Sequence, residues 1–175
     1  HAGYLLIALV SANSMGISGT LFYLLAYIFM NVGAFAIVIV LSHKNDEFIQ
    51  INDYAGLGFK HPLLAIAMTL FMFSMAGVPP MAGFVGKFYI FSAAIKSGYV
   101  VLAIIGVINS VISVYYYLRI TVIMYMKEPA REFTPLTLSP FIVAAIVISV
   151  IGTLQLGIFP SKVIEMAQQA TLILK

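Results

Sequence analysis

Long apolar runs, separated by short charged or proline-containing segments, constrain this chain more than any other feature. A helix that crosses a bilayer needs about 20 predominantly apolar residues at a rise of about 1.5 Å each. The runs here reach that length, and 62% of the 175 residues are hydrophobic while only 9% are charged. A soluble domain has about 25% charged residues. The sequence therefore predicts an all-α polytopic membrane protein.

The positions of the charges and prolines divide the chain into five membrane segments. Residues 1–10 are typical of the end of one transmembrane helix, and we expect four further transmembrane segments after it. These four cover residues 20–42, 63–95, 99–126 and 138–159. Pro160 ends the last segment, and residues 161–175 are predicted to form an amphipathic tail at the membrane interface. We expect residues 1–175 to be a single membrane domain, the C-terminal part of a longer polytopic protein.

The stretch MAGVPPMAGFVGKFYIF, residues 75–91, interrupts the third apolar run. A proline inside a helix removes an N–H group and clashes with the preceding turn, at a cost of about 3 kcal/mol or more. We therefore predict a discontinuous helix over 63–76 and 83–96. Non-helical backbone at membrane depth is tolerated where it is buried in protein or lines a wet cavity, and in transporters it marks ion pathways. The residues assigned to the break are Gly77, Pro79, Pro80, Gly83 and Gly86.

Lys87 is a single charged residue just inside the second half of this broken helix. It lies about one turn after Gly83 and about two and a half turns before Lys96, so snorkelling at a helix end does not explain it. A charged lysine at bilayer depth costs about 2.5 to 3.5 kcal/mol on an insertion scale. We therefore predict that Lys87 is a proton relay. The alternatives are that it reaches an interface or pairs statically with a carboxylate on a helix outside this sequence.

The apolar run at 99–126 contains three further candidates for pathway or structural roles: Arg119, Tyr116 and Asn109. Arg119 lies about 12 Å of helix before Lys127, so an anchoring role and a pathway role both stay open. Tyr115 to Tyr117 point in different directions because successive helical residues are about 100° apart, which favours packing, with one of the three able to face Lys87. Asn31 and Asn109 are mid-span amides, which we expect to form hydrogen bonds between helices.

The residue types present give little support to functions other than ion movement. Cysteine is absent, which excludes disulfides, thiolate metal sites and iron–sulfur clusters in this chain. The three histidines lack the spacing of metal ligands. We find no Ser/His/Asp set, phosphate loop or paired carboxylates at membrane depth, so we predict no bond-making chemistry in this chain. The net charge of +3 is scattered, which argues against nucleic-acid binding.

Four stretches resemble, in order, the last helices of subunit N of proton-pumping NADH:quinone oxidoreductase, respiratory complex I. They are HAGYLLIAL, LLAYIFMNVGAFAIV, FMFSMAGVPPMAGFVGKFYIF and VINSVISVYYYLRI. The resemblance extends over essentially the whole chain. The glycine and proline motif with its lysine is shared by antiporter-like subunits, including those of Mrp-type sodium/proton antiporters, whereas YYYLR is typical of subunit N.

The resemblance implies a subunit of fourteen helices in two inverted repeats, each repeat with one discontinuous helix. This chain would supply the end of the tenth helix and the eleventh to fourteenth helices. Lys87 matches the family's lysine on the broken twelfth helix, which passes protons toward the outer half-channel. The family's buried lysines on the seventh and eighth helices, and its glutamate on the fifth, would precede His1.

The resemblance also implies which tasks belong to other subunits. The chain would bind no cofactor itself, because NADH, FMN, iron–sulfur clusters and quinone are handled elsewhere in the complex. Its expected partners are the lipid bilayer and other membrane subunits, including neighbouring antiporter-like subunits, in a bacterial inner membrane or in an organelle inner or thylakoid membrane. Two alternatives stay open: a subunit of an Mrp-type sodium/proton antiporter, and a structural membrane scaffold without transport.

Overall fold

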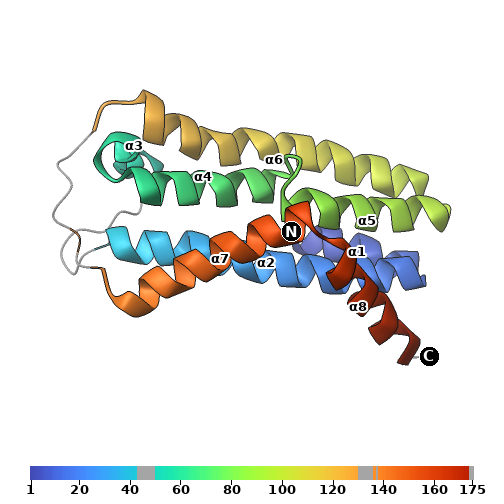
Figure 1. Ribbon diagram of the computed structural model, residues 1–175. Coiled ribbons are helices and arrows are strands. Elements are labelled where there is room, and N and C mark those ends of the chain that lie inside the picture. The colour runs from blue at the N-terminus through green and yellow to red at the C-terminus, as the bar shows by residue number, and fades with distance from the viewer. Residues whose placement is uncertain (43–49, 130–135, 137, 174–175) are drawn as a thin grey trace.

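The computed structural model describes residues 1–42, 50–129, 136 and 138–173, and these form a bundle of helices (Figure 1). Within those ranges, three helices are long and apolar enough to cross a membrane, namely α2 (Ser14–Leu41), α6 (Val100–Met126) and α7 (Pro140–Ile158). The shorter helices are α1 (Ala2–Ser11), α4 (Pro62–Ala76), α5 (Ala82–Lys96) and α8 (Ser161–Ile173). The predicted all-α membrane fold is confirmed, and six of the seven segments begin within two residues of the expected position.

The N-terminal end of α2 is where the structure differs most from the prediction. We expected the segment to begin at residue 20, but the helix begins at Ser14. The Asn13 side chain caps it by accepting a hydrogen bond from the Gly16 N–H at 2.7 Å. The hydroxyls of Ser18 and Thr20 donate to carbonyls one turn earlier, at 2.6 and 2.8 Å. The polar residues that suggested a turn are therefore satisfied inside the helix.

The connection between α2 and α4 contains two short helical turns, η1 (Ile51–Tyr54) and α3 (Leu57–Lys60). Tyr54 and Leu57 bury their side chains against the bundle, so these two turns are anchored to the core. Pro62 then begins α4 at the first helical position, where its missing N–H group leaves no hydrogen bond unmade.

Helix α2 is the centre of the bundle and packs against α4, α5, α7 and α8. Figure 1 shows α4 and α5 lying end to end, with α6 running along both. Small residues let the helices approach closely, and Gly33 of α2 lies directly against the Phe71 ring of α4. Helix α2 is apolar on every side, because its outer face carries exposed Ile28, Phe35 and Ile39. Hydrophobic periodicity therefore cannot show which face packs.

The C-terminal helix α8 is amphipathic, as the sequence predicts for the tail after Pro160. Ile164, Ala167 and Thr171 are buried at helical spacing, while the polar residues Lys162, Glu165 and Gln168 are exposed. The buried side packs against α2. Its placement along the membrane interface stays a prediction, and residues 174 and 175 lie outside the described part.

Candidate functional site

The predicted discontinuous helix is present, because α4 ends at Ala76 and α5 begins at Ala82. Gly77 ends α4 with a φ of 89°, and its N–H donates to the carbonyls of Phe73 and Ser74 at 3.1 and 3.0 Å. This left-handed cap favours glycine because a Cβ atom would be strained there. Pro79 and Pro80 lie in the unwound segment that follows, joined by a cis peptide bond.

The two half-helices are held together by direct contacts across the break. The Gly83 N–H donates to the hydroxyl of fully buried Ser74 at 3.1 Å. A Cβ added at Gly83 would lie 2.8 Å from the Ser74 carbonyl carbon, so only glycine permits this approach. Helix α7 braces the same place, since a Cβ added at Gly157 would lie 2.8 Å from the Ala82 nitrogen. Gly86 lies against a tyrosine ring of α2.

The Lys87 side chain turns back from α5 to the end of α4 and is only 4% exposed. Its Nζ donates to the carbonyls of Met75 and Ala76 at 2.9 and 3.1 Å, and to the Ser110 hydroxyl of α6 at 2.9 Å. These carbonyls belong to the last turn of α4, where backbone acceptors have no partner within the helix and carry the negative end of the helix dipole. The three acceptors match the three N–H groups of an ammonium.

The surroundings of this amine contain no carboxylate partner within the ranges that the structure describes. The Tyr4 ring of α1 lies with its centroid 4.9 Å from the Lys87 Nζ, at cation–π distance. A cavity of about 420 Å³ between α5 and α6 is lined by Lys87 and Ser110 and otherwise mostly by aromatic and aliphatic side chains. In these ranges Lys87 therefore neither reaches an interface nor pairs with an acid. No three potential metal ligands of the described chain lie together either.

A cluster of aromatic side chains lies beside Tyr4, where α1, α2 and α6 meet. The His1 ring bridges two phenols, with Nδ1 bonded to the Tyr23 hydroxyl and Nε2 to the Tyr117 hydroxyl at 2.6 Å. The Tyr27 ring lies 4.9 Å from the His1 ring, centroid to centroid. A neutral imidazole donates at one nitrogen and accepts at the other, so His1 connects the two hydroxyls in either tautomer.

The structure places the three other predicted site residues away from Lys87. Arg119 is exposed on α6, and we find no hydrogen bond or ion pair for it in the described part of the chain. Tyr116 is 49% exposed and tilts against Tyr117, with ring centroids 4.6 Å apart. Asn109 is also exposed, and with Tyr116 and His1 it lines a cavity of about 450 Å³ between α1 and α6. Of the three tyrosines, Tyr117 faces the bundle.

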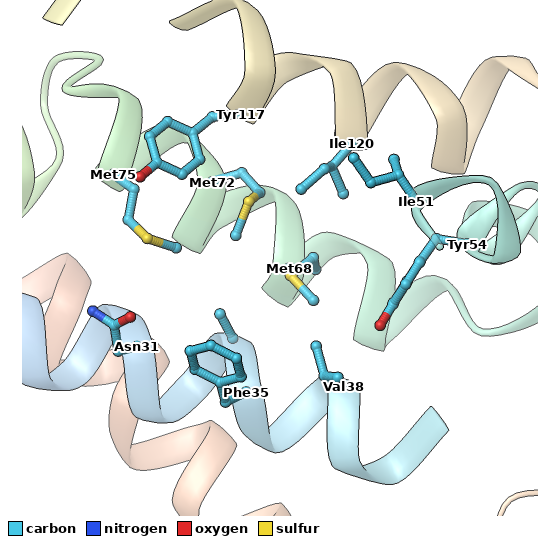
Figure 2. Close-up of a pocket in the computed structure, with 11 residues that line it drawn as sticks. Asn31, Phe35, Val38, Ile51, Tyr54, Met68, Met72, Met75, Tyr117 and Ile120 are labelled. Carbon is cyan, nitrogen blue, oxygen red and sulfur yellow. The ribbon is translucent and has the colours of Figure 1, made fainter. Parts of the chain in front are cut away.

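A third cavity, of about 310 Å³, lies between α2, α4 and α6 (Figure 2). Met68, Met72 and Met75 of α4 project into it, with Asn31 opposite and Tyr117 at one end. The Asn31 amide donates to the carbonyl one turn earlier in its own helix at 2.9 Å, so the expectation of a bond between helices is wrong. Met75 and Tyr117 connect this cavity to the Lys87 site and to the aromatic cluster.

Several residues that complete the site were missed from the sequence, namely His1, Tyr4, Tyr23 and Ser110, and Tyr117 was considered only as one of three consecutive tyrosines. One signal for them was available in α6. Gly106, Ser110, Ser113 and Tyr117 recur at spacings of four, three and four residues in an otherwise apolar helix. That spacing puts small and polar residues on one helical face. The structure shows that this face is the one directed at the bundle.

The fold and the lysine at its broken helix define a class of membrane transport subunits. A family model described as "NADH:quinone oxidoreductase/Mrp antiporter, TM" matches residues 1–113, and the chain belongs to this family. Within it, the chain is 53% identical to NADH-quinone oxidoreductase subunit N of Trichlorobacter lovleyi over 97% of its length. It is 45% identical to subunit N of Paramagnetospirillum magneticum over 99%. The resemblance to subunit N is thus confirmed, and the chain spans 35% and 36% of these two relatives.

Solved structures agree with this assignment. Respiratory complex I from Thermus thermophilus with bound aureothin contains a chain that matches with a TM-score of 0.82 and 32% identity. The match covers 94% of this chain and 37% of that one. The Mrp complex from Dietzia matches with a TM-score of 0.76 at 21% identity, over 95% and 39% of the two chains. At that identity the second match shows a shared fold only.

Proposed function

We propose that this chain is part of a proton-translocating, redox-free subunit of NADH:quinone oxidoreductase, in which Lys87 is a protonatable relay. One observation carries the proposal: the buried Nζ is held by two helix-end carbonyls and a hydroxyl. Neutral dipoles stabilise an ammonium without fixing it as a carboxylate would. A lysine held in this way changes its protonation state at lower cost than one in a buried ion pair.

The relay works through the balance between burial and the α4 carbonyls. Burial opposes the charge on Lys87, and the carbonyls of Met75 and Ala76 favour it. A positive charge that arrives nearby favours loss of the proton from Lys87. When that charge leaves, the protonated state is favoured again. The gap at the break and the adjoining cavity give water a route to the amine. Lys87 thereby couples a charge movement in the complex to the transfer of one proton.

Other subunits supply the remaining parts of this function. Electron transfer from NADH to quinone, with its FMN and iron–sulfur clusters, belongs to them, and this chain contributes no redox group. The partners are neighbouring antiporter-like and other membrane subunits of the complex. The bacterial sources of the relatives favour a bacterial inner membrane as the location. The same relatives favour this assignment over an Mrp-type sodium/proton antiporter, because both are subunit N of the oxidoreductase.

The test is the substitution Lys87→Met in the full-length protein, within the complex reconstituted in vesicles. Methionine keeps much of the side-chain volume and cannot carry a proton. A positioned proton-transfer group contributes about 10²-fold or more, so we expect proton translocation per electron to fall at least about tenfold. Lys96→Met on the same helix is the matched control, because Lys96 is exposed and its removal leaves translocation unchanged. Undiminished translocation in assembled Lys87→Met would support a structural scaffold and reject the proposal.

A further inference from the structure

The three groups that hold Lys87 differ in what they can offer an amine. The carbonyls of Met75 and Ala76 only accept hydrogen bonds, whereas the Ser110 hydroxyl both accepts and donates. A charged Lys87 needs three acceptors and has them. A neutral Lys87 has two N–H groups and one lone pair, and the lone pair needs a donor. Among these three groups, only Ser110 can meet both requirements.

We propose that Ser110 is a positioning residue that holds Lys87 in both of its protonation states. With the ammonium, Nζ–H donates to the Ser110 oxygen at the observed 2.9 Å. With the neutral amine, the Ser110 O–H donates to the Lys87 nitrogen across the same pair of atoms. The two carbonyls continue to accept the remaining two N–H groups. The side chain therefore stays in place while its charge changes.

Reversal of this hydrogen bond requires a second partner for the Ser110 hydroxyl. We assign this part to Tyr4, whose ring centroid lies 4.9 Å from the Lys87 Nζ. Ser113 already donates to the Ser110 carbonyl at 2.6 Å, so its own proton is engaged. When Lys87 is charged, the Ser110 O–H turns to the Tyr4 oxygen. When Lys87 is neutral, the Tyr4 O–H donates to Ser110 in return.

The position of Ser110 suits this role because it sits on an unbroken helix. Helix α6 is continuous from Val100 to Met126, so Ser110 is fixed by regular backbone while the α4–α5 connection is not helical. Ser110 also lines the cavity of about 420 Å³ beside Lys87. A water molecule that entered that cavity would compete with Ser110 as the donor to the neutral amine. A decisive test therefore has to distinguish the Ser110 hydroxyl from water as the donor to Lys87.

The experiment compares Ser110→Ala with Ser110→Thr in the full-length protein, within the reconstituted complex. We measure protons translocated per electron, and the amount of assembled subunit in each preparation. One lost hydrogen bond corresponds to about a three- to tenfold fall for Ser110→Ala. Ser110→Thr keeps a hydroxyl and therefore keeps the hydrogen bond to Lys87. We expect its translocation to lie within about twofold of that of the natural protein. Ser149→Ala, a buried serine on α7, is the control and stays unchanged.

Tyr4→Phe tests the second partner, because it keeps the ring beside Nζ and removes only the hydroxyl. We expect a smaller loss than for Ser110→Ala.

This inference rests on the proposed relay function, so Lys87→Met is measured in parallel. Full translocation in Ser110→Ala, with translocation lost in Lys87→Met, would overturn the role of Ser110 and leave the relay standing. Equal losses in assembled Ser110→Ala and Ser110→Thr would also overturn it, because the hydroxyl would then not be the cause. Full translocation in both Lys87→Met and Ser110→Ala would instead reject the relay itself.

Discussion

Lys87 and Arg119 are both basic residues in the interior of apolar helices, but their environments in the structure are opposite. Lys87 is 4% exposed and its Nζ has three hydrogen-bond acceptors. Arg119 lies on the outer side of α6 and has no hydrogen-bond partner in the part of the chain that is described. The two residues therefore have similar neighbours in the sequence but different surroundings in the structure.

The difference comes from the supply of free backbone acceptors. Helix α6 runs unbroken from Val100 to Met126, and its internal carbonyls are used by its own hydrogen bonds. Helix α4 stops at Ala76, which frees the carbonyls of its last turn for a side chain. A basic residue near a helix end inside the membrane can be held by backbone alone. The break, more than the lysine, creates the site.

The comparison predicts that the most damaging backbone change is one that prevents the close approach of the two half-helices at the break. In Gly83→Ala the added Cβ meets the Ser74 carbonyl, a backbone group that cannot move aside. We expect a loss of about 3 kcal/mol, the upper end of the range for overpacking. Unfolding of the full-length protein in detergent measures it. Gly3→Ala is the control, since nothing lies within 4 Å of that position. Normal stability of Gly83→Ala would show that the half-helices need no close contact.

A smaller effect is expected from Gly77→Ala, which strains the cap of α4 beside the amine. The positive φ costs about 1 to 2 kcal/mol for a residue with a Cβ atom. That Cβ would also lie 3.2 Å from the Lys87 Nζ and displace it. Gly98→Ala separates the two effects, because Gly98 has a φ of 82° in open space. We expect both variants to lose stability and only Gly77→Ala to lose proton translocation. Equal translocation in the two would show that the position of the amine is not critical.

The smallest effect is expected from Arg119→Gln. A surface substitution without specific partners changes stability by at most about 0.5 kcal/mol. We expect unchanged stability and unchanged proton translocation per electron in the reconstituted complex. A loss as large as that of Lys87→Met would place Arg119 in the pathway and end the contrast between the two residues.

The helices and the break were predictable because they follow from short-range constraints. The length of an apolar run limits each span, and two adjacent prolines cannot continue a helix. The half-helices expected at 63–76 and 83–96 are observed as Pro62–Ala76 and Ala82–Lys96. The start of α2 was missed because serine and threonine hydroxyls can bond within a helix as well as in a turn.

The burial of Lys87 also followed from the sequence, but its partners did not. Ser110 lies 23 residues after Lys87 in the chain, and Tyr4 belongs to the first helix, α1. Their contacts depend on how α1, α5 and α6 pack. In a membrane protein the outer faces are as apolar as the inner ones, so polarity does not reveal that packing. Only the stripe of small and polar residues on α6 pointed to it.

The contact of Gly157 with the unwound segment ties the break to α7 through backbone atoms. Backbone that is wedged against backbone transmits displacement, because neither side has a flexible side chain to absorb it. A shift of the α4–α5 connection therefore pushes α7, which passes through Pro160 directly into α8. The C-terminal helix is in this way joined, through a single helix, to the backbone that surrounds the buried lysine.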